Sequence, residues 1–96
     1  MNKSPCVYML ASRENGTLYI GVTSNLPRRV AQHKSGEFGG FSKRYHITRL
    51  VWYEMHPTME GAIVREKQMK KWNRAWKIRE IVRGNPEWQD LSDEIC

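Results

Sequence analysis

Short apolar runs and helix-spaced apolar stripes divide this chain into strands and helices. The apolar runs at 6–11 (Cys-Val-Tyr-Met-Leu-Ala) and 18–22 (Leu-Tyr-Ile-Gly-Val) predict two strands. Between them lies Asn15-Gly16, the strongest short signal of a hairpin. A third strand is predicted over 48–54, because Thr-Arg-Leu-Val-Trp-Tyr-Glu is rich in β-branched and aromatic residues.

Three helices are expected from about 25 to 34, from 58 to 72 and from 73 to 84. Each begins at an Asn or Thr able to cap it, and the first has Pro27 in its first turn. The glycine-rich segment 35–46 is expected to be a mobile loop. The order β-β-α-β-α-α predicts an α+β fold, in which helices flank a small three-stranded antiparallel sheet.

The length of 96 residues predicts one domain spanning 1–96. No apolar run approaches the ~20 residues that span a membrane, and no segment resembles a signal peptide. We therefore expect a cytoplasmic protein that does not contact membranes. Two cysteines, Cys6 in a predicted strand and Cys96 at the end, suggest reduced thiols.

The net charge of +6 and the pI near 9.6 favour an anionic partner. Much of the surplus lies in 65–77, whereas 87–96 is acidic. Trp72 and Trp76 interrupt the basic segment, as expected for phosphate contacts combined with base stacking. A solvated basic helix face with inward tryptophans explains the pattern equally well. The candidate nucleic-acid contacts are Lys43, Arg65, Lys70, Lys71 and Lys77.

The first helix places two polar residues on its apolar stripe. Leu26, Arg29, Val30 and His33 follow helical spacing and so share one face. Long polar side chains at the edges of such a stripe can simply reach solvent. Because an Arg and a His occur together here, one turn apart, we favour a functional role for both.

Glu66 lies at the centre of the apolar stripe of the second helix. The apolar members of that stripe are Met59, Ala62, Ile63 and Met69. A carboxylate in this position loses hydration and needs a cation or a metal. One interpretation is a structural ion pair with Arg29. The other is a functional carboxylate, which we favour because an apolar residue would stabilise the contact at least as well.

Tyr8 and Tyr19 should share one face of the sheet. In a tight hairpin centred on Asn15-Gly16, Ser12 lies opposite Tyr19, which leaves the two tyrosines roughly 13 Å apart along the strands. A longer loop of the same parity would bring them closer. Either tyrosine alone is more typical of packing than of chemistry.

These motifs together resemble the GIY-YIG nuclease family, in particular its small stand-alone bacterial members. Those members look like the N-terminal nuclease module of the bacterial excision-repair nuclease. The resemblance covers essentially the whole chain. The matching segments are Cys6-Val7-Tyr8, Leu18-Tyr19-Ile20-Gly21-Val22-Thr23, Leu26-x-x-Arg29-x-x-x-His33-Lys34, Leu50-Val51-Trp52-Tyr53-Glu54, Ala62-Ile63-x-Arg65-Glu66-Lys67-Gln68-x-Lys70-x-Trp72 and Asn85-Pro86-x-Trp88-x-Asp90-Leu91.

The resemblance implies a site on the tyrosine-bearing face of the sheet and metal-dependent hydrolysis of a phosphodiester. By this resemblance Glu66 is the ligand of Mg²⁺ or Mn²⁺, and Arg29 contacts the scissile phosphate. Tyr8, Tyr19 and His33 surround the attacking water. Tyr19 and His33 are alternative proton acceptors, since the phenol needs nearby cations whereas imidazole titrates near neutrality.

The leading hypothesis is a DNA endonuclease of repair or recombination. The second is a module that binds DNA or RNA without turnover, because the asparagine that active members often carry after the glutamate is missing at that spacing. Asn73 comes too early and Asn85 too late. The third is a protein-interaction domain anchored by Trp72, Trp76 and Trp88. We expect DNA to be preferred over RNA, with sequence specificity that is either low or supplied by a protein partner.

Overall fold

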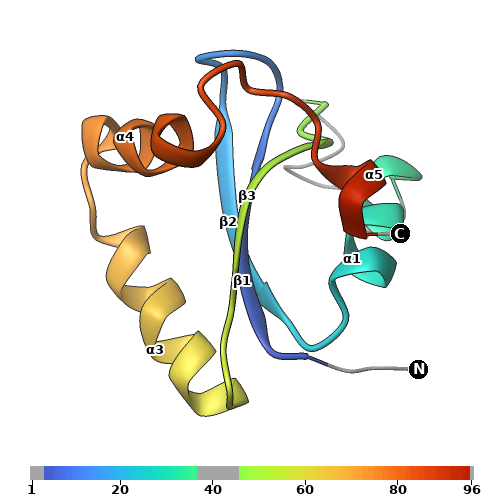
Figure 1. The fold of residues 1–96 in the computed structure, drawn as a ribbon, viewed down its shortest axis with the longest axis vertical. Helices are drawn as coiled ribbons and strands as arrows, with labels where there is room; N and C mark the ends of the chain where they lie inside the picture. Colours follow the sequence, from blue (N-terminus) through green and yellow to red (C-terminus); the bar gives the residue numbers. More distant parts are fainter. Residues whose placement is uncertain (1–3, 37–45, 96) are drawn as a thin grey trace.

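The structure is a computed structural model that describes residues 4–36 and 46–95. Its three strands form an antiparallel sheet in the order β2-β1-β3, and helices cover both faces, which confirms the predicted α+β fold (Figure 1). The short last helix was not predicted. The elements are β1 (Cys6–Ala11), β2 (Leu18–Thr23), α1 (Leu26–Lys34), β3 (Arg49–Met55), α3 (Met59–Lys70), α4 (Arg74–Gly84) and α5 (Ser92–Ile95).

The helix starts follow the expected capping chemistry. Asn25, Thr58 and Asn73 each accept a hydrogen bond from a backbone N–H in the first turn of the helix that follows. These bonds satisfy N–H groups that have no partner within the helix. The three predicted N-caps are confirmed, and α3 ends slightly earlier than expected.

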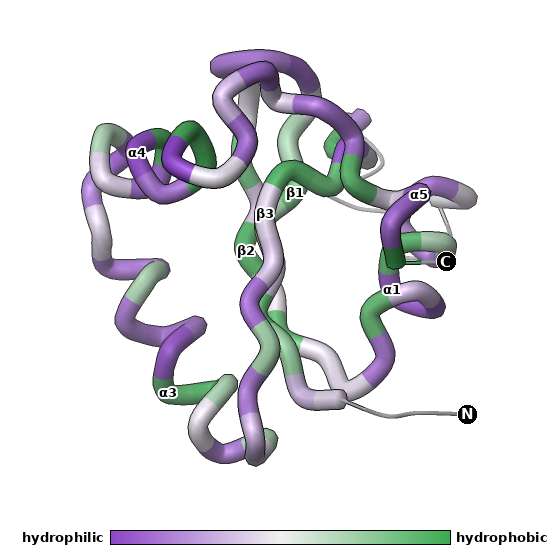
Figure 2. Tube along the Cα trace, viewed as in Figure 1, coloured by the Kyte–Doolittle hydropathy of each residue, from purple (hydrophilic) through white to green (hydrophobic). Residues whose placement is uncertain are grey.

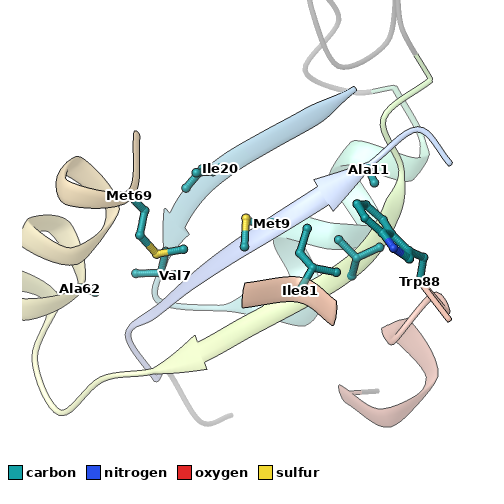
Figure 3. Close-up of a cluster of buried hydrophobic side chains, with 9 residues drawn as sticks. Val7, Met9, Ala11, Ile20, Ala62, Met69, Ile81 and Trp88 are labelled. Atoms are coloured by element: carbon teal, nitrogen blue, oxygen red, sulfur yellow. The ribbon is translucent and has the colours of Figure 1, made fainter. Parts of the chain in front are cut away.

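The two faces of the sheet carry separate cores. α3 and α4 cover one face, and α1 and α5 cover the other (Figure 1). The α3–α4 side buries Val7, Met9, Ala11, Ile20, Val51, Ala62, Met69, Ile81 and Trp88 (Figure 3). The α1 side buries Cys6, Tyr8, Leu10, Leu26, Val30, Ile47 and Leu50. The helices accordingly mix hydrophobic and hydrophilic residues along their length (Figure 2).

The segment after α4 covers the outer edge of β3. The Leu91 N–H donates to the Leu50 carbonyl at 2.7 Å, and the buried Asn85 side chain donates to the Val51 carbonyl at 3.1 Å. Trp88 lies in the hydrophobic core even though its backbone has a φ of 55°. Covering part of an edge strand is one way in which proteins limit its pairing with other chains. Asn85 therefore has a structural role in this fold.

Three sequence-based expectations fall on the parts not described. Lys43 lies outside the described residues, as does most of the predicted loop 35–46. Cys96 is also outside them, whereas Cys6 is a buried free thiol whose pKa burial raises to about 11. Within the described ranges, no helix has the length and apolar character needed to cross a membrane.

Candidate functional site

The two signature tyrosines meet on the α1 face of the sheet, at a register different from the predicted one. Leu10, not Ser12, lies opposite Tyr19, and the Ser12 N–H instead donates to the Thr17 carbonyl at 3.0 Å. The connection is therefore longer than a tight two-residue hairpin, with the same parity. The prediction that Tyr8 and Tyr19 share one face of the sheet is confirmed. The predicted separation of roughly 13 Å along the strands is wrong, since the centroids of the two rings are 6.2 Å apart.

Gly21 is required by the side chain of Tyr8. The two residues are cross-strand partners, and the fully buried Tyr8 ring lies across the glycine. A Cβ atom at Gly21 would lie 2.4 Å from Tyr8 Oη and 2.5 Å from Tyr8 Cζ, which is closer than any real contact. The glycine of the second signature thus fixes where the phenol of the first one points.

His33 and Arg29 project from α1 toward these tyrosines. His33 is 3% exposed, and its Nε2 lies 3.1 Å from Tyr8 Oη. The His33 ring is also 5.0 Å from the Tyr19 ring, edge to face. Arg29 is half-buried, and its guanidinium interacts with the Tyr8 hydroxyl. The predicted inward stripe of α1 therefore brings four candidate residues into one cluster.

This environment keeps both Tyr8 and His33 uncharged near neutrality. Burial raises the pKa of Tyr8 above its usual range, and the neighbouring Tyr19 adds to the effect, while Arg29 opposes it. Burial, followed by the Arg29 charge, lowers the pKa of His33 below 6.5. Tyr8 is thus suited to donate a hydrogen bond and His33 to accept one.

Arg29 also lines a polar cleft beside the first turn of α1. The cleft has a volume of about 250 Å³ and is lined by Thr23, Ser24, Asn25, Arg28, Arg29 and Gln32. Adjacent arginines near a helix N-terminus favour an anionic ligand, because the helix dipole adds to their charge. Arg28 and Gln32 do not belong to the Leu26–His33 stripe and were not among the predicted site residues, although the Arg28-Arg29 pair is a visible signal in the sequence.

Glu66 lies on α3, on the opposite face of the sheet from the tyrosine cluster (Figure 1). It is 8% exposed, as its place in the apolar stripe predicted, and α3 packs against β2 and β1. Its Oε2 lies 2.8 Å from Lys70 Nζ within the same helix. The alternative interpretation, an ion pair between Glu66 and Arg29, does not hold, since Glu66 pairs with Lys70 and α1 lies on the other face of the sheet (Figure 1). The candidate residues therefore approach β2 from both faces, not from the tyrosine face alone.

A metal at this site would depend on Glu66. Over 4–36 and 46–95, no three or more His, Cys, Asp or Glu side chains gather where they could hold a metal ion. A single carboxylate nevertheless fits Mg²⁺ or Mn²⁺, which take oxygen ligands and fill most of their shell with water and substrate phosphate. Lys70 is 57% exposed at its side chain, so its ammonium can move away from Glu66 into solvent.

The predicted nucleic-acid contacts differ in how accessible they are. The Arg65 Nε donates to Glu54 Oε1 at 3.0 Å, and its guanidinium lies 5.1 Å from the centre of the Trp72 ring. Arg65 is therefore held against the protein surface. Lys71 is exposed and Lys77 is half-exposed, so both can reach a phosphate backbone.

The three tryptophans proposed as protein anchors occupy different environments. Trp88 is only 2% exposed, so its predicted role as a surface anchor is wrong. Trp72 is partly buried and packs against the α3–α4 core. Trp76 alone among the three is exposed, at 47%.

Comparison with known proteins identifies the family of this chain. The sequence pattern of the family described as "GIY-YIG catalytic domain" matches residues 4–79 of this chain. This range includes the two tyrosine signatures, α1 and α3, the helix that carries Glu66. The chain belongs to the GIY-YIG family. Membership places it among the domains of a nuclease family.

Its relatives match over most of their length. A UPF0213 protein of Syntrophus aciditrophicus is 38% identical over 82 residues, which cover 84% of this chain and 92% of the relative. A UPF0213 protein of Natronomonas pharaonis is 37% identical over 76 residues, which cover 79% of this chain and 88% of the relative. The solution structure of a UPF0213 protein of Bacillus halodurans superposes with a TM-score of 0.56 at 25% identity, covering 92% of this chain and 93% of that one. The likeness is to small GIY-YIG proteins of the stand-alone kind.

Proposed function

We propose that this GIY-YIG protein is a divalent-cation-dependent endonuclease that hydrolyses DNA phosphodiester bonds, with nicked or branched DNA of repair or recombination as its substrate. The observation that carries the proposal is the cluster of Tyr8, Tyr19, His33 and Arg29 on one side of β2, with Glu66 on the other. A phosphodiester lying along the β2 edge would meet Arg29 from one face and Glu66 from the other.

Each residue of the cluster has a distinct task in this proposal. Arg29, which lines the polar cleft, binds the scissile phosphate and stabilises charge that develops in the transition state. Tyr8 stays protonated and donates its hydroxyl hydrogen bond to His33, which holds the imidazole in place. Tyr19 is half-buried and borders the cluster beside His33, and in its phenolate form it takes the proton of the attacking water and becomes the phenol.

Glu66 would hold the cation together with water and substrate phosphate. The cation, when bound, supplies Lewis-acid stabilisation of the phosphate charge and of the leaving oxygen. Lys70 must release Glu66 before the cation binds, because its ammonium occupies Oε2 at 2.8 Å. A negatively charged DNA backbone near Lys70 offers it an alternative partner and so favours this release.

Cleavage of a defined DNA panel tests the proposal. The full chain is mixed with duplex, nicked and branched DNA in the presence of Mn²⁺, with EDTA as the control. We expect cleavage with Mn²⁺ and none with EDTA. Salt-dependent binding without cleavage on any substrate would instead support a binding module, in which the Lys70–Glu66 ion pair is permanent.

The basic surface of α3 and α4 should dominate the salt dependence of binding. Replacing Lys70, Lys71 and Lys77 together by Ala should lower the slope of log affinity against log salt by up to about 3, since each phosphate contact contributes about 0.9. Fluorescence anisotropy from ~50 to ~200 mM salt measures the slope, over which several contacts change affinity by orders of magnitude.

The control for this measurement is Arg83→Ala. Arg83 is an exposed arginine at the far end of α4 that already pairs with Glu80, so its removal should leave the slope unchanged. A triple variant with the wild-type slope would exclude these lysines as phosphate contacts.

A further inference from the structure

An exposed tryptophan projects from the junction of α3 and α4. Trp76 is 47% exposed, and its ring meets Trp72 edge to face, with centroids 6.3 Å apart at 77°. Trp72 is in turn packed against the core and covered by the Arg65 guanidinium at 5.1 Å. We call Arg65, Trp72 and Trp76 the aromatic corner. Its inner members are held by the fold, whereas the outer indole is open to solvent.

The aromatic corner is held in a fixed place relative to the candidate site. The backbone N–H of Trp76 donates to the capping side chain of Asn73 at 2.9 Å, and this bond fixes the backbone that carries the indole. Arg74 donates to the carbonyls of Asn15 and Gly16 at 2.7 and 2.6 Å, which ties the start of α4 to the β1–β2 turn. Tyr19 follows Gly16 by three residues, roughly 10 Å along an extended chain. The corner therefore lies near the β2 end of the candidate site.

The charge around the corner indicates what kind of molecule would cover it. The segment that carries the corner is strongly basic, and its carboxylate, Glu66, is buried and paired. The basic side chains of the segment are Arg65, Lys67, Lys70, Lys71, Arg74 and Lys77. Basic side chains beside an open aromatic face are the arrangement by which proteins bind single-stranded nucleic acid, because each base offers a π-face and each nucleotide a phosphate.

We infer that Trp76 stacks on an unpaired base of the DNA substrate, next to the bond positioned at the β2 edge. The inference rests on the proposed function and narrows its substrate class. The preferred DNA carries a gap, overhang or frayed end beside the cleavage position, because the bases of a continuous duplex are stacked on one another and unavailable to the indole. Lys71 and Lys77 then contact the phosphates on either side of the stacked base.

Binding without a cation tests the inference independently of cleavage. Affinities are measured in EDTA for a continuous duplex, for the same duplex with a short single-stranded gap, and for the gapped duplex with abasic sites. The wild-type protein should bind the gapped DNA about 10-fold more tightly than the other two, within the range that one base–aromatic stack provides. Trp76→Ala should lose that preference and keep its affinity for duplex, while Trp76→Phe should retain most of the preference.

Val82→Ala is the matched control, since Val82 is an exposed hydrophobic residue, 38% accessible, on the same helix. It should behave as wild type, and thermal melts should show that all three variants fold. Equal wild-type affinity for gapped and continuous DNA, or a Trp76→Ala protein that keeps the preference, would overturn the inference while leaving the proposed nuclease intact. The latter result would point to a protein partner for Trp76. If no DNA binds in a salt-dependent way, the proposed function itself fails.

Discussion

Replacing Glu66 by Gln should abolish cation-dependent cleavage and leave the fold nearly unchanged. Cleavage should fall by more than about 100-fold, since even residues that only support a metal ligand cost 10–100-fold when removed. Gln keeps the shape of the side chain but carries no charge to hold Mn²⁺. Cleavage rates, together with thermal melts with and without Mn²⁺, measure both effects. Wild type should melt higher with Mn²⁺, because a ligand that binds only the folded state stabilises it, and the variant should not respond.

The expected stability of this variant follows from the ion pair that it breaks. Glu66 pairs with Lys70 one turn later in the same helix, and the lysine is largely exposed. Such pairs contribute only about 0.3–0.5 kcal/mol, which corresponds to a melting shift of no more than about 4 °C for a domain of this size. A strut between α1 and α3 would have cost several kcal/mol, because its loss leaves a charge buried alone.

Glu80→Gln is the matched control for Glu66→Gln. Glu80 is also a largely buried glutamate, 14% exposed at its side chain, that pairs with an arginine of its own helix. Its replacement should cost similar stability and leave cleavage and the Mn²⁺ response intact. If Glu66→Gln cuts DNA at the wild-type rate, or if wild type shows no Mn²⁺ shift while the variant melts far lower, Glu66 is structural and not a metal ligand.

The contrast between confirmed and wrong expectations at the tyrosines has a physical cause. Alternation of side chains placed Tyr8 and Tyr19 on one face, because that depends only on the period of a strand. Their register depends on the turn, where Ser12 Oγ accepts a hydrogen bond from the Thr17 N–H and Asn15 adopts a φ of 56°. Asn15-Gly16 signalled a hairpin but not its length, so the parity was predictable and the distance was not.

For Glu66, too, one property was predictable from the sequence and another was not. Its burial follows from the helical period of α3 alone and was predictable. Its partner depends on which face of the sheet each helix covers, which the helical period does not specify. Arg29 and Glu66 looked like natural partners in sequence, yet α1 and α3 lie on opposite faces (Figure 1).

The C-terminal segment was the least predictable part of the fold. Asn85 donates to the carbonyls of Val51 and Gln89, and Asp90 accepts from the Leu50 N–H at 3.3 Å. The bonds to Val51 and Leu50 join side chains to a distant strand, and such bonds have no periodic signature in sequence. From the sequence, Asn85 could be judged only by its distance from Glu66, as a candidate for the asparagine found in active family members. The structure shows that Asn85 makes buried hydrogen bonds, and these explain the residue by a structural role.

Replacing Tyr19 by Phe should lower the cleavage rate by about 100-fold or more, with little change in stability. Tyr8 is held protonated by burial and its hydroxyl already contacts His33 at Nε2, which leaves Tyr19, in its phenolate form, as the favoured acceptor of the water proton. Loss of a general base typically costs 10²–10⁴-fold. The Phe ring preserves the packing 5.0 Å from His33, so the melting temperature should stay near that of wild type.

Tyr53→Phe provides the comparison, since Tyr53 packs on the same sheet face and its hydroxyl donates to Glu94 at 3.0 Å. It should cut at the wild-type rate. If Tyr19→Phe also cuts at that rate, the proton goes to His33 or Tyr8, and the pH profile separates them. Because burial and Arg29 lower the pKa of His33, a His33 base would stay active down to below pH 6.5 and lose activity only as the imidazole protonates there. A Tyr8 base, with its raised pKa, would instead gain activity steadily as pH increases through the neutral range.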